Sequence, residues 1–408
     1  MRVSVIIPTY NRAEMLRDTL RNLARQDIPV DDFEVIVSDD GSTDHTKAVV
    51  DSFAGQLHMK YHFMEYLGFR AGHARNAGAG MASAPLLVFL DTGGMVGPGF
   101  LRAHLAEHAR PGGPRAIVGY AYGYNPDYGH DEVEAIAEAM SRMPPEQVVE
   151  HFAGKSWFLD LRHGLYEKYD FDLSRMAIPW LLFFTINVSV PAEQFHATGG
   201  FDEGFDRWGC EDMHLGFRLF RNGVPLVLSR TAWALEYPHE RNRANDMQDV
   251  AINLRYFLRG WEEPQVELLA LLIPRLLFGT IDDECRAVLD WAASVRDLDV
   301  SAEIDAAVKE IGPTGRIAVL GAGGRVPPSL PPATLYDVDR ELLQRATAGG
   351  GHTGHHRIGV LTGLEDQSVD TVIITSRMAG LWDRWGEDLL AEAGRVGRKI
   401  HLTFDAHS

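Results

Sequence analysis

The chain has 408 residues, of which 45% are hydrophobic and 24% charged, a balance typical of a globular protein with two or three domains. Its formal net charge of −18 excludes binding of nucleic acid by bulk attraction, so an anionic ligand has to be held by local donors or a metal ion. Two cysteines, Cys210 and Cys285, exclude a disulfide framework and a cysteine-ligated zinc site, and they fit a reducing compartment. The N-terminus leads directly into a strand pattern and no apolar run approaches the length of a membrane span, so we expect a cytoplasmic protein without a transmembrane segment.

Strand and helix patterns alternate over the first ninety residues. We expect strands at residues 3–7, 33–38, 59–64 and 86–90, and helices at residues 11–26, 44–53 and 72–82. The last of these helices is rich in glycine and alanine and has to pack closely. This alternation predicts a parallel, doubly wound α/β sheet.

The pattern changes after Gly99. We expect strands at residues 117–124, 183–190 and 225–234, helices at 131–143, 146–152 and 211–222, an irregular aromatic stretch at 157–179, and a loop at 199–209. Residues 245–311 are predicted to be helical throughout, and Gly312-Pro313 is predicted to mark a domain boundary. Strands then follow at residues 316–320, 334–336, 370–375 and 399–404, with a Gly/His-rich patch at 349–356 that we expect to be a flexible loop. The predicted domains are therefore residues 1–244, a helical linker at 245–312, and a small α/β domain at 313–408.

Asp91 ends the apolar strand at residues 86–90 and is followed by Thr92 and two glycines. Open α/β sheets bind ligands at the carboxyl ends of their strands, and an unpaired buried charge is too unfavourable to serve packing. Asp91 is thus either a ligand of a divalent cation or a cap for the turn that follows.

Five motifs stand in order over residues 1–260: VSVIIPTYNR, VIVSDDGSTD, ARNAG, LVFLDTG and WGCEDMHLGFRL. Together they resemble the family 2 glycosyltransferases, which are inverting enzymes with the GT-A fold, a mostly parallel mixed sheet between helices. The resemblance implies a nucleotide-sugar donor, here a UDP-sugar, and an acceptor hydroxyl or other nucleophile on a carbohydrate, peptide or natural product.

The resemblance assigns the donor site to the ends of the first strands. Tyr10 can stack on a planar base, and Asp39 can accept hydrogen bonds from uracil or ribose; the family binds uridine at these positions. The alternatives are a core aromatic for Tyr10 and a cap of the Gly41 turn for Asp39, although Asp40 is the more natural cap. The other expected donor-site residues are Pro8, Thr9, Asn11, Arg70, Arg75 and Asp91.

The family's Asp-x-Asp motif holds a divalent metal on the donor diphosphate. Here it is Asp91-Thr92-Gly93, so the second carboxylate is missing. Asp91, the diphosphate, waters and His239 could complete an octahedral Mg²⁺ or Mn²⁺ site. His239 is otherwise an ordinary surface histidine.

Glu211 and Asp212 open a helix, where the free N–H groups favour carboxylates. In the family the aspartate of this pair is the catalytic base, so Asp212 is expected to take the acceptor proton and Glu211 to contact the acceptor or the backbone. Trp208, Gly209 and Asn187 are the expected acceptor-side residues, and the aromatic stretch between residues 120 and 179 is expected to shape the same side.

The C-terminal stretch resembles the nucleotide-binding half of a class I methyltransferase. Residues 317–324 (IAVLGAGG) form a strand and a glycine-rich turn, and Asp337 ends the next strand, where a ribose-binding acid would stand. The stretch is short for that fold, so we expect a truncated, non-catalytic domain for packing, partner docking or homo-oligomer formation. The alternative is a bifunctional glycosyltransferase and methyltransferase.

Two other functions compete with glycosyl transfer. A nucleotidyltransferase usually carries a glycine-rich basic loop after its first strand, and PTYNRAEM lacks one. A nucleotide-sugar-binding protein with a decayed metal site would account for the missing second aspartate of the metal motif. Retention of Asp91, Glu211 and Asp212 argues against it.

Overall fold

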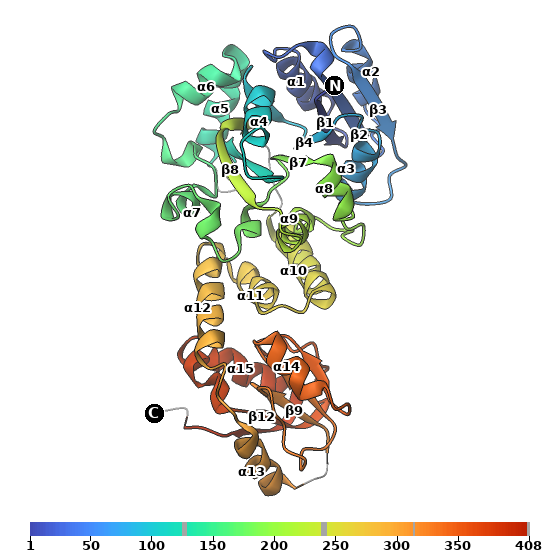
Figure 1. Ribbon diagram of the computed structural model, residues 1–408. Coiled ribbons are helices and arrows are strands. Elements are labelled where there is room, and N and C mark those ends of the chain that lie inside the picture. Colours follow the sequence, from blue (N-terminus) through green and yellow to red (C-terminus); the bar gives the residue numbers. More distant parts are fainter. Residues whose placement is uncertain (125–128, 238–242, 313–314, 406–408) are drawn as a thin grey trace. The chain divides into compact units, whose positions relative to one another are not determined.

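Two units make up the chain, Met1–Asn253 and Leu254–Ser408. The computed structural model describes residues 1–124, 129–237, 243–312 and 315–405 (Figure 1). The boundary between the units falls inside helix α10 (Arg243–Gly260), so the segment expected as a separate linker is divided between them.

The described part of the first unit contains one eight-stranded sheet in the order β3-β2-β1-β4-β7-β6-β8-β5. Neighbours β3, β2, β1 and β4 are parallel, as are β6 and β8, while β7 runs antiparallel to β4 and β6, and β5 to β8. The sheet is therefore mixed, and its parallel half is the one that the alternating sequence pattern predicts. The strands are β1 Val3–Thr9, β2 Phe33–Asp39, β3 Met59–Phe63, β4 Leu86–Leu90, β5 Gly94–Val96, β6 Ala116–Tyr122, β7 Asn187–Pro191 and β8 Leu226–Glu236.

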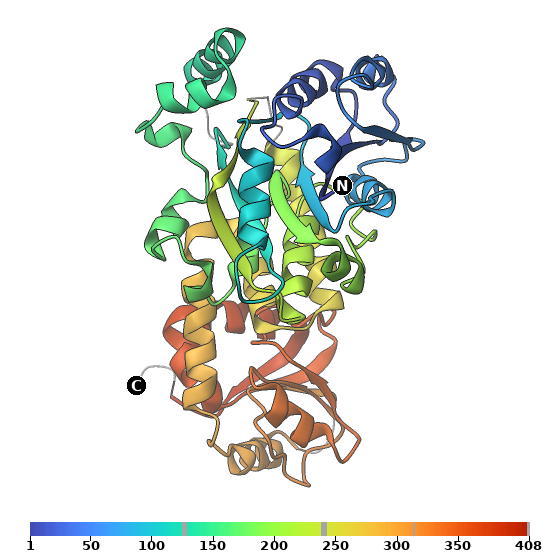
Figure 2. The same ribbon diagram turned by 45° about the horizontal axis from the view of Figure 1, so that its top comes forward.

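The helices of this unit follow the expected positions, with three additions. They are α1 Ala13–Leu23, α2 Thr46–Ser52, α3 Ala71–Gly80, α4 Phe100–His108, α5 His130–Arg142, α6 Pro145–His151, α7 His163–Lys168, α8 Ala192–Ala197 and α9 Glu211–Arg221. Sequence patterns did not predict α4, α7 or α8. Helix α4 (cyan in Figure 2) packs against β8 and lies over the antiparallel half of the sheet.

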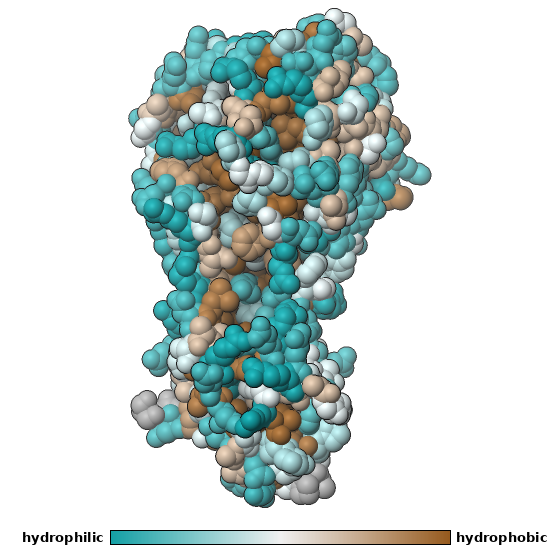
Figure 3. Space-filling view, in the orientation of Figure 1, coloured by the Kyte–Doolittle hydropathy of each residue, from teal (hydrophilic) through white to brown (hydrophobic). Residues whose placement is uncertain are grey.

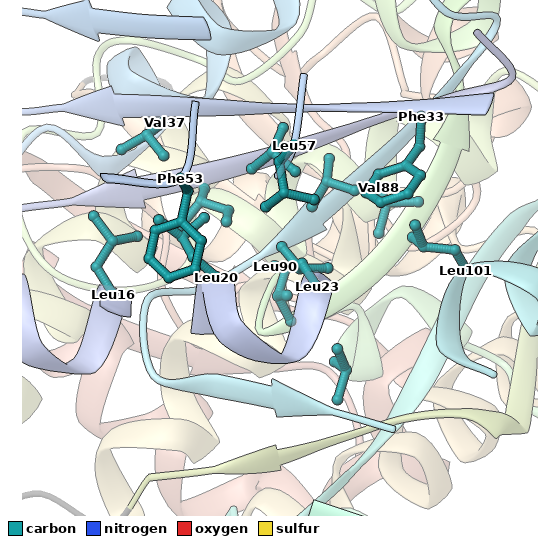
Figure 4. Close-up of a cluster of buried hydrophobic side chains, with 14 of the residues drawn as sticks. Leu16, Leu20, Leu23, Phe33, Val37, Phe53, Leu57, Val88, Leu90 and Leu101 are labelled. Carbon is teal, nitrogen blue, oxygen red and sulfur yellow. The ribbon is translucent and has the colours of Figure 1, made fainter. Parts of the chain in front are cut away.

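Helices α1 and α2 cover one face of the parallel strands, and α3 covers the other (Figure 1). Leu16, Leu20 and Leu23 project from α1 at helical spacing and meet Phe53 and the alternating residues of β2 (Figure 4). On the opposite face a Cβ added to Gly78 would stand 2.6 Å from the side chain of Ile6. This contact confirms that the Gly/Ala-rich helix packs directly on β1.

The parallel strands bring three chain segments to one edge of the sheet. Thr9 ends β1 opposite Asp39, which ends β2, and Asp91 follows β4. Because β7 is antiparallel to β4, the start of β7 lies at the same edge, and Asn187 pairs with Leu90. Strand β7 begins four residues later than predicted, since Pro179–Leu182 forms a short 3₁₀ helix and residues 183–186 lead from it to the edge of the sheet.

The second unit has a five-stranded parallel sheet in the order β11-β10-β9-β12-β13. This is the strand order of a doubly wound sheet, with the first strand of the unit in the middle. Its strands are β9 Ile317–Leu320, β10 Ala333–Tyr336, β11 Thr353–His355, β12 Val369–Ile374 and β13 Gly397–Leu402. Strand β11 lies inside the Gly/His-rich patch that was expected to be a loop.

The helices of the second unit are α11 Pro264–Leu272, α12 Ile281–Ser294, α13 Ser301–Ile311, α14 Arg340–Thr347 and α15 Trp382–Val396. Residues 321–332, all of which are described, contain no helix between β9 and β10, as the proline pairs at 327–328 and 331–332 suggest. In the described ranges, no helix is both long and apolar enough to cross a bilayer. Hydrophilic residues predominate on the face shown in Figure 3, with apolar residues scattered between them.

Candidate active site

A cavity of about 540 Å³ lies at the edge of the first sheet where β1 and β4 end. From the parallel half of the sheet and the segments next to it, the cavity is lined by Pro8, Thr9, Tyr10, Arg12, Asp40, Tyr66, Phe69, Arg70, Ala71, Ala74, Arg75, Asp91 and Thr92. From the later part of the unit it is lined by Tyr124, Phe184, Thr185, Ile186, Trp208, Gly209, Glu211, Asp212, Glu236 and Asp246. Most of the residues predicted for the site therefore share one cavity.

Asp212 lies in the first turn of α9 and faces this cavity. Its Oδ1 accepts a hydrogen bond from the Met213 amide at 2.7 Å, and its Oδ2 accepts one from the Thr185 amide at 3.4 Å. Burial and the negative charge of Glu211 raise the pKa of Asp212 to about 7, against the opposing effect of Arg75. A carboxylate with a pKa near neutrality is well suited to take a proton from a substrate hydroxyl.

The backbone before Asp212 is strained. Gly209 and Cys210 both have left-handed φ angles, of 92° and 74°, and such a conformation is unfavourable for a cysteine. The Asn253 side chain donates hydrogen bonds to the carbonyls of Gly209 at 2.6 Å, Arg207 at 3.0 Å and Trp208 at 3.3 Å. Asn253 thus holds the strained turn that places Asp212, a role that its position in a helical stretch did not reveal.

Arg75 joins two of the predicted carboxylates. Its guanidinium donates to Glu211 Oε1 at 2.9 Å and to Asp91 Oδ1 at 2.8 Å, and its side chain is only 5% exposed. Burial lowers the pKa of Arg75, but the charges of Asp91 and Glu211 outweigh that effect and raise it. The guanidinium therefore stays charged and fixes the distance between the end of β4 and the start of α9.

The two aspartates at the end of β2, Asp39 in the strand and Asp40 directly after it, have the opposite arrangement from the one expected. Asp39 is 1% exposed and caps the turn, because its Oδ1 accepts from the Ser42 amide at 2.8 Å while its Oδ2 accepts from the Tyr61 hydroxyl at 2.7 Å. Asp40 lines the cavity and accepts from the Arg70 guanidinium at 2.8 Å and from the Arg70 amide at 3.1 Å. Adjacent acids on one turn cannot be told apart by residue type alone.

Tyr10 lies at the cavity with its ring parallel to that of Tyr66. The ring centroids are 4.5 Å apart with an interplanar angle of 10°. Asn11 is not among the lining residues; its Oδ1 accepts from the Thr43 amide at 2.8 Å and braces the loop after β2. The Pro8 carbonyl accepts from the Thr92 hydroxyl at 2.8 Å, which ties the ends of β1 and β4 together.

The residues expected on the acceptor side divide into two groups. Trp208 and Gly209 line the cavity near Asp212, together with Tyr124 and Phe184 from the aromatic stretch. Asn187 is fully buried instead: its Oδ1 accepts a hydrogen bond from His104 Nε2 at 3.0 Å, and its Nδ2 donates to the Ala232 carbonyl at 2.8 Å. Its side chain belongs to the packing between α4 and the sheet and not to the cavity wall.

The protein ligands for a metal ion are few. Asp91 lines the cavity with a side chain that is 38% exposed, and one of its oxygens accepts from Arg75. His239, the other expected ligand, lies outside the described residues. Among the residues that are described, no group of three or more His, Cys, Asp or Glu side chains is placed to hold a metal. This donor set fits only an ion that takes most of its ligands from a diphosphate and water, as Mg²⁺ often does.

Comparison with known proteins identifies the family. The sequence profile of glycosyl transferase family 2 matches residues 4–158, and that of the N-terminal domain of galactosyltransferase matches residues 169–239. A validoxylamine A glucosyltransferase of Streptomyces hygroscopicus subsp. jinggangensis is 42% identical over 98% of this chain and 96% of its own length. The chain belongs to the family 2 glycosyltransferases. It is therefore an enzyme that transfers a glycosyl group, and the nucleotidyltransferase and the non-enzymatic binding protein are excluded as its primary function.

Other known proteins are more distantly similar to this chain. The uncharacterized glycosyltransferase YfnE of Bacillus subtilis is 29% identical over 63% of this chain and 69% of its own length. Among solved structures, Staphylococcus aureus TarS 1-349 in complex with UDP-GlcNAc matches 63% of this chain and 67% of its own, with 20% identity and a TM-score of 0.45. The mannosyltransferase PcManGT of Pyrobaculum calidifontis, solved with GDP-Man and Mn²⁺, matches 76% of this chain and 80% of its own, with 20% identity and a TM-score of 0.46.

Proposed function

We propose that this glycosyltransferase moves a glucosyl group from UDP-glucose to a hydroxyl of validoxylamine A or a closely related acceptor, with inversion at the anomeric carbon. The sugar and the acceptor follow from the relatives at 42% identity, which match nearly the whole chain and are named validoxylamine A glucosyltransferases. The uridine nucleotide follows from the resemblance of the motifs around Tyr10 and Asp39. The cavity supports the proposal because Tyr10, Asp91 and Asp212, the residues proposed to stack on the base, to lie beside the diphosphate and to take the proton, all line it.

The observation that carries the mechanism is the position of Asp212. This carboxylate faces the cavity beside Trp208 and has a pKa raised to about 7. In the proposed reaction Asp212 accepts the proton of the acceptor hydroxyl as its oxygen forms a bond to the anomeric carbon. The bond between that carbon and the diphosphate breaks on the opposite face, and UDP leaves with the electron pair.

The remaining residues position the donor. Tyr10 stacks on the base, and Asp40 and Arg70 offer hydrogen-bonding groups at its margin, with Asp39 holding the turn beneath them. Arg75 keeps Asp91 and Glu211 in place and contributes positive charge at the centre of the site. Asp91 would hold a Mg²⁺ or Mn²⁺ ion, which would supply positive charge to neutralise the donor diphosphate.

The acceptor is proposed to lie between α9 and the aromatic wall. Trp208, Tyr124 and Phe184 offer faces on which the rings of a polyhydroxylated acceptor can pack. The Arg162 guanidinium lies over the ring of Phe184, 5.0 Å from its centroid, and is locked by buried contacts with Asp160. That support makes the aromatic wall a preformed surface.

We propose that the second unit has no methyltransferase activity. The side chain of Asp337, which would bind a ribose in such an enzyme, is instead paired with Arg377 through contacts of 3.0 Å from each of two guanidinium nitrogens. Both side chains are almost completely buried, and Asp337 also accepts from the amide of Gly323 in the glycine-rich turn. The carboxylate that would bind the ribose of a nucleoside is thus already paired with the chain's own arginine. A packing or homo-oligomer role remains our proposal for this unit, and the buried, unpaired state of Cys210 and Cys285 supports a cytoplasmic setting.

The experiment is a transfer assay with the purified protein, validoxylamine A, a divalent cation and a panel of UDP-, GDP- and ADP-linked sugars. Mass spectrometry should detect one added hexosyl group with UDP-glucose and not with the other nucleotides. An Asp212→Asn variant serves as the matched control for contaminating activity. Transfer from GDP- or ADP-linked donors in preference to UDP-glucose, or no transfer to validoxylamine A, would contradict the proposal.

A further inference from the structure

The stacked pair of Tyr10 and Tyr66 leaves no room for a base between the two rings. Their centroids are 4.5 Å apart and nearly parallel, whereas a third ring inserted between them would need about twice that separation. The two residues come from different segments: Tyr10 follows β1, and Tyr66 lies between β3 and α3. Both line the cavity at its donor side.

The pair is not part of the hydrophobic core. Tyr10 is 39% exposed and Tyr66 is 48% exposed, so neither ring is fixed by surrounding side chains on all sides. An aromatic face that is half open at a cavity wall is a place where another planar group can stack. In this structure the ring of Tyr66 is the planar group that stacks on Tyr10.

The backbone around Tyr66 is firmly held. The Met64 amide donates to the Asp39 carbonyl at 2.8 Å, and Arg70 is fixed to Asp40 on the other side of the segment. Gly41, with a φ of 91°, lies so close that an added Cβ would stand 2.6 Å from the Tyr66 nitrogen. Only a residue without a side chain fits this contact, and it ties the segment to the turn after β2. Tyr66 can therefore leave Tyr10 by side-chain rotation, without any unfolding of the segment.

We infer that the Tyr66 ring occupies the stacking position of the donor base on Tyr10 and is displaced when the nucleotide binds. The inference rests on the proposed function in that the donor is taken to be a uridine nucleotide. It makes Tyr66 a residue that opposes donor binding, because the stack between the two tyrosines has to be broken first. Asp40, from the turn after β2, and Arg70, at the end of the segment that carries Tyr66, line the same cavity and are paired with each other.

Calorimetric titration with UDP tests this inference with four variants. Tyr66→Ala should bind UDP about two- to tenfold more tightly than the unaltered protein, which corresponds to the usual strength of an aromatic pair. Tyr10→Ala should bind UDP more weakly, and Tyr66→Phe, which keeps the ring, should stay close to the unaltered protein. Leu67→Ala is the matched control, because Leu67 is in the same segment, is 72% exposed and does not line the cavity.

Titration of Tyr66→Ala with pyrophosphate distinguishes displacement of the Tyr66 ring by the base from a general widening of the cavity. Pyrophosphate lacks a base, so Tyr66→Ala should leave its affinity unchanged while the affinity for UDP rises. Weaker or unchanged UDP binding by Tyr66→Ala would overturn the inference, since a ring that clamps the base from above would produce such a loss. An unaltered protein that binds UDP but transfers no sugar contradicts the proposed function alone, whereas one that binds no UDP contradicts both.

Discussion

Lowering the pH through 7 tests the role of Asp212, because this carboxylate can accept a proton only when it is ionised. Burial and the charge of Glu211 raise its pKa to about 7, so one pH unit below that value only about one tenth of the molecules carry the ionised base. The transfer rate should therefore fall about tenfold for each unit below pH 7 and should level off above it. Values of kcat/KM for UDP-glucose, measured between about pH 5 and pH 9, give the profile of the free enzyme, to which this pKa belongs.

Two variants test whether this pH profile arises from Asp212 and its neighbour Glu211. Asp212→Asn should lower the turnover number by about 10²–10⁴-fold and leave UDP affinity nearly unchanged, since the uridine contacts lie on other strands. Glu211→Gln removes a negative charge that raises the pKa of Asp212, so the inflection of any residual activity should move to lower pH. A rate that is independent of pH, or transfer by Asp212→Asn at the rate of the unaltered enzyme, would refute the assignment.

Further predictions concern the residues that hold the active site in position, the metal ion and the second unit. Asn253→Ala removes the hydrogen bonds to the turn before α9 and should lower turnover roughly ten- to a hundredfold at unchanged UDP affinity, as steady-state kinetics and calorimetry can show. Arg75→Ala leaves Asp91 and Glu211 without their shared partner and should destabilise the fold by about 3 kcal/mol or more in urea denaturation. Asp91→Ala should abolish stimulation by Mg²⁺ or Mn²⁺, whereas full activity of the unaltered enzyme in excess EDTA would show that no metal is needed. Titration with S-adenosylmethionine should give no heat of binding, and micromolar affinity would restore the bifunctional alternative.

The parallel half of the first sheet could be predicted closely from the sequence. Strand β4 is a continuous apolar run, β1 and β2 are mostly apolar and buried, and α1 carries apolar residues at regular spacing, so local pattern and tertiary burial agree. Among the helices that the sequence did not predict, α4 and α14 are two that share one cause. Their sequences mix charged and apolar residues over only nine and eight positions, and packing against the sheets stabilises them.

Only some of the residues predicted for the site line the cavity, because the type of a residue does not determine the direction in which its side chain points. Asp39 and Asp40 are chemically equivalent in sequence, yet the pleat of β2 and the Gly41 turn point one inward and the other to the cavity. Asn187 starts a strand at the correct edge, but its side chain faces α4. Tyr66 and Asn253 carried no signal, since their roles depend on contacts between segments far apart in the chain.

The configuration of the product tests the central claim most directly. UDP-glucose carries an α-linked glucose, and attack assisted by Asp212 on the face opposite the diphosphate must give a β-linked product. Nuclear magnetic resonance of the isolated product identifies the anomeric configuration of the new bond. A β-glucoside is the result that a single displacement in this cavity predicts, and an α-glucoside would contradict it.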